Sequence, residues 1–379
     1  MKVPSKAKRK LHWVCESPSH YNDFLFRALT ESSEFELNVH YRSSFDVGYQ
    51  WGIAPESGYS ARSFSSRFDR TLFALVLRDQ DSLFLTSCWQ DLTCQVILIA
   101  LMIIGRPYLI WNDTPTPRRR GWFEEKARVV FLRAVFRHAT TVLGTGSLAL
   151  KAFREIGAPP DKLLNFPYCV DLNRFAPGIT ARASTRFVLG TCARLERIKG
   201  VDVALRALAK CDLSARPFLY RIAGAGSEEG ALRDLVRSLG LTDCVEFCGW
   251  LQPRELPDFY KSLDVYLHPA LFEPYGVAVV EALASGIPVL ASDRTSSAID
   301  LTTHENGLLH RAGNPDDVRR TLETFVPRIV TEREKMSQSA RKAATAWTVE
   351  QAVETIERIV KRSDIAAPEA AGVQIGEGA

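Results

Sequence analysis

The chain has 379 residues, 46% of them hydrophobic and 24% charged, which is the balance of a soluble globular protein with two domains or one large one. Its net charge of +4 is too small to indicate a nucleic-acid partner. The charge is uneven, because residues 1–180 carry 23 Lys and Arg against 17 Asp and Glu. We therefore expect the first half to face an anionic surface or partner.

The eight cysteines are scattered, and several lie in strand-like apolar runs, as small core residues do. Cys244 and Cys248 have no second Cys or His pair at zinc spacing, so we interpret them as structural. A reduced, cytoplasmic protein is expected. No long apolar segment follows the basic N-terminal residues, so no signal peptide is expected. The apolar run Val96–Ile104 is shorter than the ~20 residues of a membrane span, and it predicts a buried helix.

In the first half, short apolar runs alternate with helical patterns. The expected strands are Leu11–Cys15, Phe35–Tyr41, Leu83–Thr86, Tyr108–Trp111 and Thr141–Leu143. The expected helices are Phe24–Leu29, Trp89–Ile104, Glu124–His138 and Ser147–Ile156. The polar, Gly-containing segment Ser43–Ser65 is predicted to be a loop able to shape an acceptor pocket.

Between Asp171 and Ser184 the composition turns to Pro, Gly, Thr and Ala, which indicates a linker, and the alternation then restarts. The expected strands are Phe187–Cys192, Phe218–Ala223, Val245–Phe247, Val265–His268 and Val289–Ala291. The expected helices are Gly200–Ala209, Glu228–Leu239, Pro253–Leu263, Val277–Ser285, Pro315–Phe325, Arg328–Ala346 and Val349–Lys361. Residues 363–379 have no core-forming content and are expected to be disordered.

Strands that alternate with helices predict an α/β fold with parallel, helix-covered sheets. We expect two doubly wound, Rossmann-like domains, at 1–175 and 185–345, that face each other across a cleft. Ligands of such sheets bind at the carboxyl ends of the strands.

The segment 271–291, LFEPYGVAVVEALASGIPVLA, places two carboxylates eight residues apart. Pro274 and Gly276 break regular structure, so a helix that contains Glu281 is expected to begin just after Glu273. A solvated helical face would account for Glu281 alone. A free helix N-terminus attracts phosphate, however, and carboxylates on either side can accept hydrogen bonds from sugar hydroxyls. The pair therefore favours a nucleotide-sugar site.

Two cations lie in the turn after the first strand of the second half. Arg194 and Lys199 precede the helix expected at Gly200, where they could neutralise a diphosphate. The alternative is a pair of solvated surface charges. The matching position of the Glu273 segment favours the diphosphate interpretation.

Two other patterns indicate what the site is not. Gly224-Ala225-Gly226 is one residue too far from Gly230 for the dinucleotide fingerprint, so we interpret it as a tight turn close to a ligand. The first strand–helix turn contains no glycine, which argues against a Rossmann dehydrogenase. Asp79-Gln80-Asp81 could hold a divalent cation, but it precedes a strand instead of following one, and no metal is expected there.

The segment Arg118–Arg137 interleaves basic with aromatic and aliphatic side chains. Such a helix can lie on an anionic membrane surface. It can equally be a core helix with a solvated basic face, and the sequence leaves both interpretations open.

Three stretches of the second half resemble a known family. They are GTCARLERIKGVD, RIAGAGSEEGALRDLVRSLGLTDCVEFCGW and EPYGVAVVEALASGIPVLASD, and they are similar to the retaining glycosyltransferases of family 4, which have the GT-B fold. The resemblance covers Phe187 to about Leu309, and the first half matches only in layout.

The resemblance implies a role for each matching residue. Glu273 would hold donor sugar hydroxyls, and Glu281 the ribose diol. Arg194 and Lys199 would stabilise the leaving diphosphate, so neither a metal nor another cofactor is implied. The other implied donor contacts are Gly224, Gly226, Tyr275, Gly276 and Val277. A final helix at 346–362 would cross back to cover the first domain.

Two departures from the family pattern concern the first half. Many relatives carry a glycine pair in the first strand–helix turn, where this chain has Ser17-Pro18-Ser19-His20. Many also carry a His after the fourth strand, where this chain has Asn112 and Asp113. His20, Asn112 and Asp113 are therefore the candidate acceptor or sugar contacts.

The expected activity is sugar transfer, with retention, from a nucleotide-diphosphate-sugar to a hydroxyl of a cell-surface glycan or lipid-linked acceptor, as in polysaccharide or lipopolysaccharide biosynthesis. A nucleotide-sugar epimerase or hydrolase on the same fold is one alternative, and a non-catalytic nucleotide-sugar-binding protein is another. The expected location is cytoplasmic, with peripheral association at the inner face of the membrane through Arg118–Arg137 left open.

Overall fold

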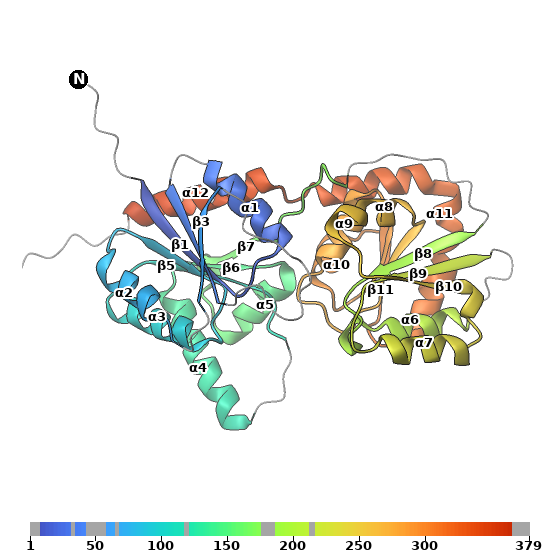
Figure 1. Cartoon of the computed structure of the whole chain (residues 1–379), viewed down its shortest axis with the longest axis horizontal. Helices are drawn as coiled ribbons and strands as arrows, with labels where there is room; N and C mark the ends of the chain where they lie inside the picture. The colour runs from blue at the N-terminus through green and yellow to red at the C-terminus, as the bar shows by residue number, and fades with distance from the viewer. Residues whose placement is uncertain are drawn as a thin grey trace, which may run out of the picture.

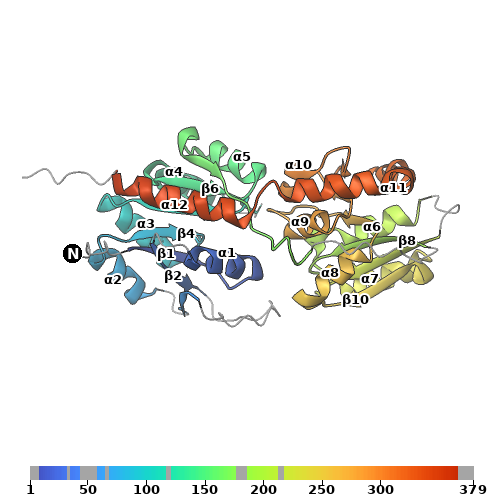
Figure 2. The same cartoon turned by 90° about the horizontal axis from the view of Figure 1, so that it is seen from above.

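The computed structural model describes residues 8–31, 35–42, 58–64, 68–116, 121–175, 186–211 and 217–365. These residues form two parallel sheets, one from each half of the chain, which lie side by side in Figure 1. Helices cover both faces of each sheet, as the view from above in Figure 2 also shows. The predicted α/β architecture of two doubly wound domains is confirmed.

The first sheet has seven strands in the order β3-β2-β1-β4-β5-β6-β7. Their bounds are β1 Arg9–Cys15, β2 Phe35–Tyr41, β3 Ser60–Ser63, β4 Leu83–Thr86, β5 Tyr108–Asn112, β6 Thr141–Gly144 and β7 Leu163–Asn165. Both neighbours of β1 run parallel to it, and its buried Leu11 and Trp13 lie at the centre of the sheet. The change of direction in strand order at β1 creates a crevice at the carboxyl ends of the strands.

The prediction of a loop over Ser43–Ser65 is wrong for residues 60–63, which form the edge strand β3 beside β2. This strand has the sequence SARS and exposed or half-buried side chains, so no apolar alternation marks it. Residues 43–57 and 65 of that predicted loop lie outside the described residues. The same holds for 176–184 of the predicted linker and for 366–379 of the tail.

Two helical layers enclose the first sheet. The helices are α1 His20–Glu31, α2 Arg70–Arg78, α3 Leu92–Ile103, α4 Trp122–His138 and α5 Ser147–Ile156. One core lies between the sheet and α1, and a second lies between the sheet and α2 to α5. Helix α2 was not expected, although Asp69 caps its N-terminus by accepting a hydrogen bond from the backbone N of Leu72.

The prediction that the apolar run Val96–Ile104 is a buried helix is wrong for one face. Ile97 and Leu101 are buried in the core beneath α3, but the side chain of Ile103 is 79% exposed. Ile99, one turn earlier, is 43% exposed. A helix that is apolar all round does not reveal from sequence which of its faces is covered.

The second sheet has six parallel strands in the order β10-β9-β8-β11-β12-β13. Their bounds are β8 Phe187–Cys192, β9 Phe218–Ala223, β10 Val245–Gly249, β11 Val265–His268, β12 Val289–Ser292 and β13 Gly307–His310. The helices around it are α6 Val201–Leu208, α7 Glu229–Ser238, α8 Leu256–Lys261, α9 Val277–Ala284, α10 Ser296–Leu301 and α11 Pro315–Ala344. The sequence pattern identified all of these except α10 and β13.

The two helical patterns expected at Pro315–Phe325 and Arg328–Ala346 form one helix, α11, with a kink at Glu332. Pro327, five residues earlier, lacks the backbone N–H that an uninterrupted helix needs. The chain then leaves the second domain as α12 Val349–Ile365, which packs against α1 of the first domain (Figure 2). Ile356 and Val360 of α12 belong to the core of the first domain.

Candidate active site

A cleft of about 670 Å³ lies between the two domains. Its walls include the last residues of four strands: Cys15 of β1, Asn112 of β5, Cys192 of β8 and His268 of β11. The first turn of α9 also lines it. The cleft therefore occupies the carboxyl edge of both sheets, where a doubly wound fold binds its ligands.

Lys199 and Glu273 form an ion pair inside this cleft. The Lys199 Nζ atom donates to the Glu273 Oε2 atom at 2.5 Å, and each side chain is only 14% exposed. His268 Nε2 lies 3.4 Å from the same oxygen. Burial by itself raises the pKa of Glu273, but the Lys199 ammonium and the His268 ring outweigh it and lower this pKa to about 2. Glu273 is thus an ionised carboxylate near neutral pH.

Glu281, which lies one turn into α9, has a different environment. The Tyr260 hydroxyl donates to its Oε2 atom at 2.7 Å. Burial raises the pKa of Glu281 to about 7, and the Tyr260 hydrogen bond and the Arg174 charge offset only part of this. The two carboxylates of the segment therefore have pKa values on opposite sides of the ordinary value. Their different partners predict different roles.

The N-terminus of α9 opens onto the cleft between these carboxylates. Gly276 caps this helix with φ of +97° and, as a glycine, supplies no capping side chain of its own. A Cβ atom at this position would lie 2.8 Å from the Thr295 Cγ2 atom, so only glycine fits. Val277 and Ala278 of the first turn line the cleft. Backbone N–H groups at such a helix end are suited to binding an anion.

Gly224, which follows β9, also lines the cleft. Its φ is +133°, and a Cβ atom would come within 1.9 Å of the Ala193 carbonyl oxygen. The glycine thus lets two strand-end loops approach each other, one of which carries Arg194. Both Gly224 and Arg194 line the cleft, but Gly226 does not.

The first domain contributes Asn112 and Asp113 to the cleft. Asp113 accepts hydrogen bonds from Thr145 Oγ1 at 2.6 Å and from the Tyr168 hydroxyl at 3.1 Å. Burial raises the pKa of Asp113, and these two hydrogen bonds lower it in part. Because both its oxygens accept bonds within the protein, its geometry favours holding the Tyr168 ring, which stands 5.6 Å from the ring of Tyr275. The Asn112 Nδ2 atom is buried and has no hydrogen-bond partner among the described residues, so Asn112 is the better candidate for a substrate contact.

The structure brings nearly all predicted site residues into this one cleft. Those lining it are Asn112, Asp113, Arg194, Lys199, Gly224, Glu273, Tyr275, Gly276, Val277 and Glu281. His20 begins α1 beside it but does not line it, although Ser19 and Tyr21 do. Burial lowers the pKa of His20 to about 4, so its ring is neutral near pH 7.

Sequence reasoning missed His268 and Tyr260. The position of His268 offered a clue, because it is the last residue of a buried strand and therefore had to reach the carboxyl edge. Tyr260 lies within α8, where the sequence pattern of an aromatic residue indicates only a core position.

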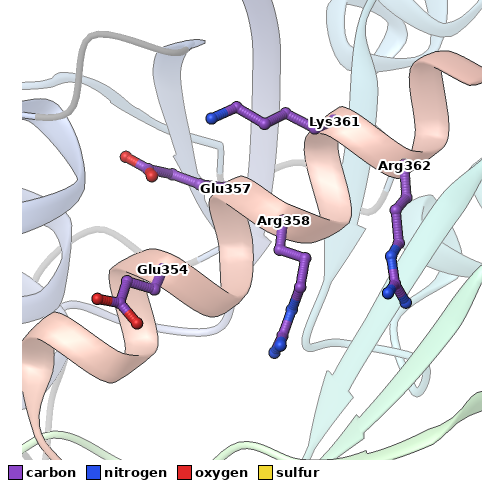
Figure 3. A pocket seen from close by; sticks show the side chains of 5 residues that line it. All are labelled: Glu354, Glu357, Arg358, Lys361 and Arg362. Atoms are coloured by element: carbon purple, nitrogen blue, oxygen red, sulfur yellow. The ribbon is translucent and has the colours of Figure 1, made fainter.

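A second hollow of about 310 Å³ lies on α12 (Figure 3). Figure 3 shows its charged side chains spreading from a single helix, with Lys361 and Arg358 pointing to opposite sides. They do not converge on one point, so we assign no site to this hollow. Among the described residues, no cluster of His, Cys, Asp and Glu is arranged to hold a metal ion.

Residues 174–343, which include Arg194, Lys199, Glu273 and Glu281 of this cleft, match the family model of the glycosyl transferases group 1. The second half of the chain belongs to this family. It is 30% identical over 248 residues to a D-inositol 3-phosphate glycosyltransferase of Rhodococcus erythropolis, covering 61% of this chain and 54% of the relative. A D-inositol 3-phosphate glycosyltransferase of Acidothermus cellulolyticus is 32% identical over 221 residues, covering 54% of this chain and 48% of the relative. The chain spans about half the length of the curated relatives that it matches.

Solved structures show that the fold is GT-B. The Anabaena Alr3699/HepE structure in complex with UDP superposes with a TM-score of 0.74 at 18% identity, covering 93% of this chain and 100% of that chain. The lipopolysaccharide outer core galactosyltransferase WaaB superposes with a TM-score of 0.69 at 15% identity, covering 93% and 99%. The predicted family and fold are both confirmed.

Proposed function

We propose that this chain transfers a sugar, with retention of configuration, from a nucleotide-diphosphate-sugar to a hydroxyl of a cell-surface glycan or lipid-linked acceptor. One observation carries the proposal. Lys199, Glu273 and Glu281 surround the open N-terminus of α9 in a single interdomain cleft. This arrangement offers a cation and backbone donors for a diphosphate, flanked by two carboxylates for two polyols.

The donor side of the cleft suits a uridine diphosphate sugar. The diphosphate would lie between the first turn of α9 and the cations Arg194 and Lys199. The ribose would reach Glu281, and the sugar would reach Glu273. Support for this nucleotide comes from the relative HepE, whose structures are described in complex with UDP and with UDP-glucose.

The proposed reaction develops negative charge on the departing diphosphate. The bond between the sugar anomeric carbon and the phosphate oxygen breaks, and the diphosphate leaves with the electron pair. The acceptor hydroxyl oxygen bonds to that carbon from the same face, and its proton passes to the departing phosphate oxygen. Arg194 and Lys199 stabilise the developing negative charge, each by about 3 kcal/mol on the scale of other preorganised electrostatic donors.

The acceptor would enter from the first domain, where Asn112 and Asp113 line the cleft and His20 lies beside it. Relatives of similar fold are described as lipopolysaccharide glycosyltransferases, and relatives of similar sequence as transferring to an inositol phosphate. These acceptors share a hydroxyl on a polar, cell-envelope or phosphorylated molecule. We propose the same class of acceptor for this chain.

Release of nucleoside diphosphate from a panel of nucleotide sugars, with and without a crude glycolipid extract, tests this function. A transferase releases diphosphate only when donor and acceptor are both present. Turnover without acceptor would instead identify a hydrolase, and interconversion of sugar nucleotides would identify an epimerase. Binding of a donor with no turnover under any condition would identify a non-catalytic binding protein.

A further inference from the structure

The large exposed apolar side chains of this protein are concentrated on one part of the first domain. Among the described residues, eight of the eleven such side chains lie on α2, on α3 with its C-cap, or on α4. The most exposed are Phe123 at 81%, Ile103 at 79%, Val130 at 68% and Trp122 at 62%. These three neighbouring helices cover the same face of the first sheet, so we name their outer surface the α2–α4 face.

Helix α4 is the most unusual element of this face. Its N-terminal half projects beyond the body of the domain in Figure 1. Trp122, Phe123, Lys126 and Ala127 are all exposed there, and burial begins only at Leu132. A helix in water normally keeps one apolar stripe covered. A projecting turn that exposes adjacent aromatic rings is therefore incomplete without a partner.

The charge of the α2–α4 face indicates an anionic partner. Between their caps, the three helices carry six Lys and Arg and two Asp and Glu, and α3 carries no charged side chain. The capping carboxylates Asp69, Asp79 and Asp91 pair with basic side chains on other elements. One of the two acids, Glu125, is paired with Arg128. The Lys126 ammonium lies 4.1 Å from the centroid of the Trp122 ring. An indole beside a cation, next to bare aliphatic side chains, is typical of a segment at a membrane interface.

We propose that the α2–α4 face docks on an anionic lipid bilayer, with Phe123, Val130 and Ile103 entering the boundary between head groups and acyl chains. The contact is peripheral, since no helix among the described residues is long and apolar enough to span a membrane. The proposal takes the membrane-surface interpretation of the basic segment and adds α2 and α3 to that surface.

The chain length from this face to the cleft narrows the acceptor class. Thr116 lines the cleft, and Trp122 follows it by six residues, which an extended chain spans in at most ~21 Å. A bilayer that holds the tip of α4 therefore lies close to the cleft mouth. Resting on the proposed function, this makes the acceptor a membrane-anchored glycolipid whose head group reaches into the cleft. The lipid contact itself needs no donor.

Co-sedimentation of the purified full chain with mixed phosphatidylcholine–phosphatidylglycerol vesicles tests the proposal, with pure phosphatidylcholine vesicles beside them. We expect the chain to bind the anionic vesicles and to bind the neutral ones more weakly. Phe123→Glu on α4 and Ile103→Glu on α3 should each weaken the binding about tenfold or more, since a charge disfavours burial at the interface. Val330→Glu, at a half-exposed apolar position on α11, is the matched control and should bind like the wild type.

Three outcomes would overturn the proposal. They are wild-type chain that binds neither vesicle, variants that bind as tightly as wild type, and a wild-type dimer that Phe123→Glu converts to monomer without any lipid binding. The last would assign the face to a second copy of the chain. The thermal shift produced by UDP, measured on the same samples without lipid, reports separately on the proposed function. A variant that keeps this shift has kept its fold and its donor site.

Discussion

The Lys199 ammonium lies 2.5 Å from the Glu273 carboxylate. The two groups proposed to bind the diphosphate and the sugar therefore neutralise each other's charge. Both are mostly buried, so neither is left as an uncompensated charge. Donor binding would replace this ion pair with two interactions. The diphosphate would pair with the Lys199 ammonium, and the sugar hydroxyls would donate hydrogen bonds to the Glu273 carboxylate.

Replacing Lys199 with Ala should lower kcat about 10²- to 10³-fold, because the charge that develops on the diphosphate loses its nearest ammonium. Lys199→Arg keeps the charge and should recover part of the rate. The measurement is steady-state kinetics with the donor identified by the turnover panel. Circular dichroism of both variants checks that the fold survives, since Glu273 loses its partner in the Ala variant. Wild-type turnover by a folded Lys199→Ala protein would remove Lys199 from the mechanism.

Glu281→Gln should change stability and donor affinity in opposite directions. The folded-state pKa of Glu281 is about 7, above its ordinary value of 4.5, so the folded protein binds this proton more tightly than the unfolded chain. Glu281 therefore contributes up to about 3 kcal/mol to the free energy of unfolding. This contribution is fully present below pH 4.5 and is lost as the pH rises through 7. The Gln variant should therefore unfold at higher urea concentration at pH 8 while binding UDP more weakly.

The pH dependence of UDP affinity gives a second check on Glu281. An ionised carboxylate accepts hydrogen bonds from both ribose hydroxyls, whereas the protonated form accepts fewer. Wild-type affinity should therefore rise between pH 6 and pH 8, with a midpoint near the pKa of about 7. Isothermal titration at several pH values measures it. An equally steep rise in Glu281→Gln would assign the titration to another group.

His40 should make the first domain sensitive to acid. Arg62 Nε donates to His40 Nδ1 at 2.9 Å, and His40 Nε2 lies 3.0 Å from His12 Nδ1. With its Nδ1 accepting, neutral His40 donates to His12 through Nε2. Burial, together with the neighbouring His12 and Arg62, lowers the pKa of His40 to about 3. The Asp69 carboxylate opposes this shift. Burial also lowers the pKa of His12, which Asp79 raises in part and which Lys10 and Arg106 lower.

The folded state thus binds fewer protons at these histidines than the unfolded chain once the pH falls below about 6.5. Each depressed pKa removes stability as pH falls, at up to about 1.4 kcal/mol per pH unit. Urea unfolding at pH 7 and pH 5 should show a smaller loss in His40→Gln than in wild type. The opposite contribution of Glu281 in this range is common to both proteins and cancels. Equal losses would contradict the prediction.

Asp300 should help to hold the two domains together. Helix α5 of the first domain has Gly146 at its N-cap and therefore no capping side chain of its own. Asp300 on α10 of the second domain accepts from the Ser147 backbone N at 2.9 Å and caps the helix from across the interface. Thr114 Oγ1, which donates to the Pro274 carbonyl at 3.0 Å, is a second contact of this kind.

Asp300→Ala removes this cap, worth about 1 kcal/mol, and should loosen the domain arrangement. Small-angle scattering should show a larger radius of gyration than in wild type. Asp293→Ala is the control, because Asp293 accepts from the Ala312 backbone N within the second domain alone. Identical scattering curves for Asp300→Ala and Asp293→Ala would show that the cap does not contribute to the interface.

The sequence predicts the buried parts of this fold well. The strands Leu83–Thr86 and Phe187–Cys192 occur at the predicted residues, because buried parallel strands are largely apolar runs between turn residues. Phe35–Tyr41 also occurs as predicted, since its apolar residues alternate with polar ones. The edge strand Ser60–Ser63 was missed for the converse reason: partly exposed side chains leave no pattern to read. Helix α2 could have been predicted, since Asp69 is a capping residue and the buried Leu72 and Val76 are spaced one helical turn apart.

The site residues likewise fall into those that the sequence could predict and those that depend on packing. The residues of 271–291 could be grouped from their spacing alone, because they are local in sequence. Tyr260 and His268 act through contacts with Glu281 and Glu273 that depend on how α8 and β11 pack. Likewise, the packing of neighbouring elements decides which face of α3 is exposed, and the apolar run Val96–Ile104 carries no information about that packing.

Titration of UDP against wild type, Lys199→Ala and Glu281→Gln is the most direct test that this cleft binds a nucleotide-sugar donor. The described geometry predicts one UDP per chain for wild type, and weaker binding for each variant by about tenfold or more, since each loses a charge-assisted contact. Wild-type protein that binds no nucleoside diphosphate, or variants that bind UDP as tightly as wild type, would contradict the assignment of this cleft.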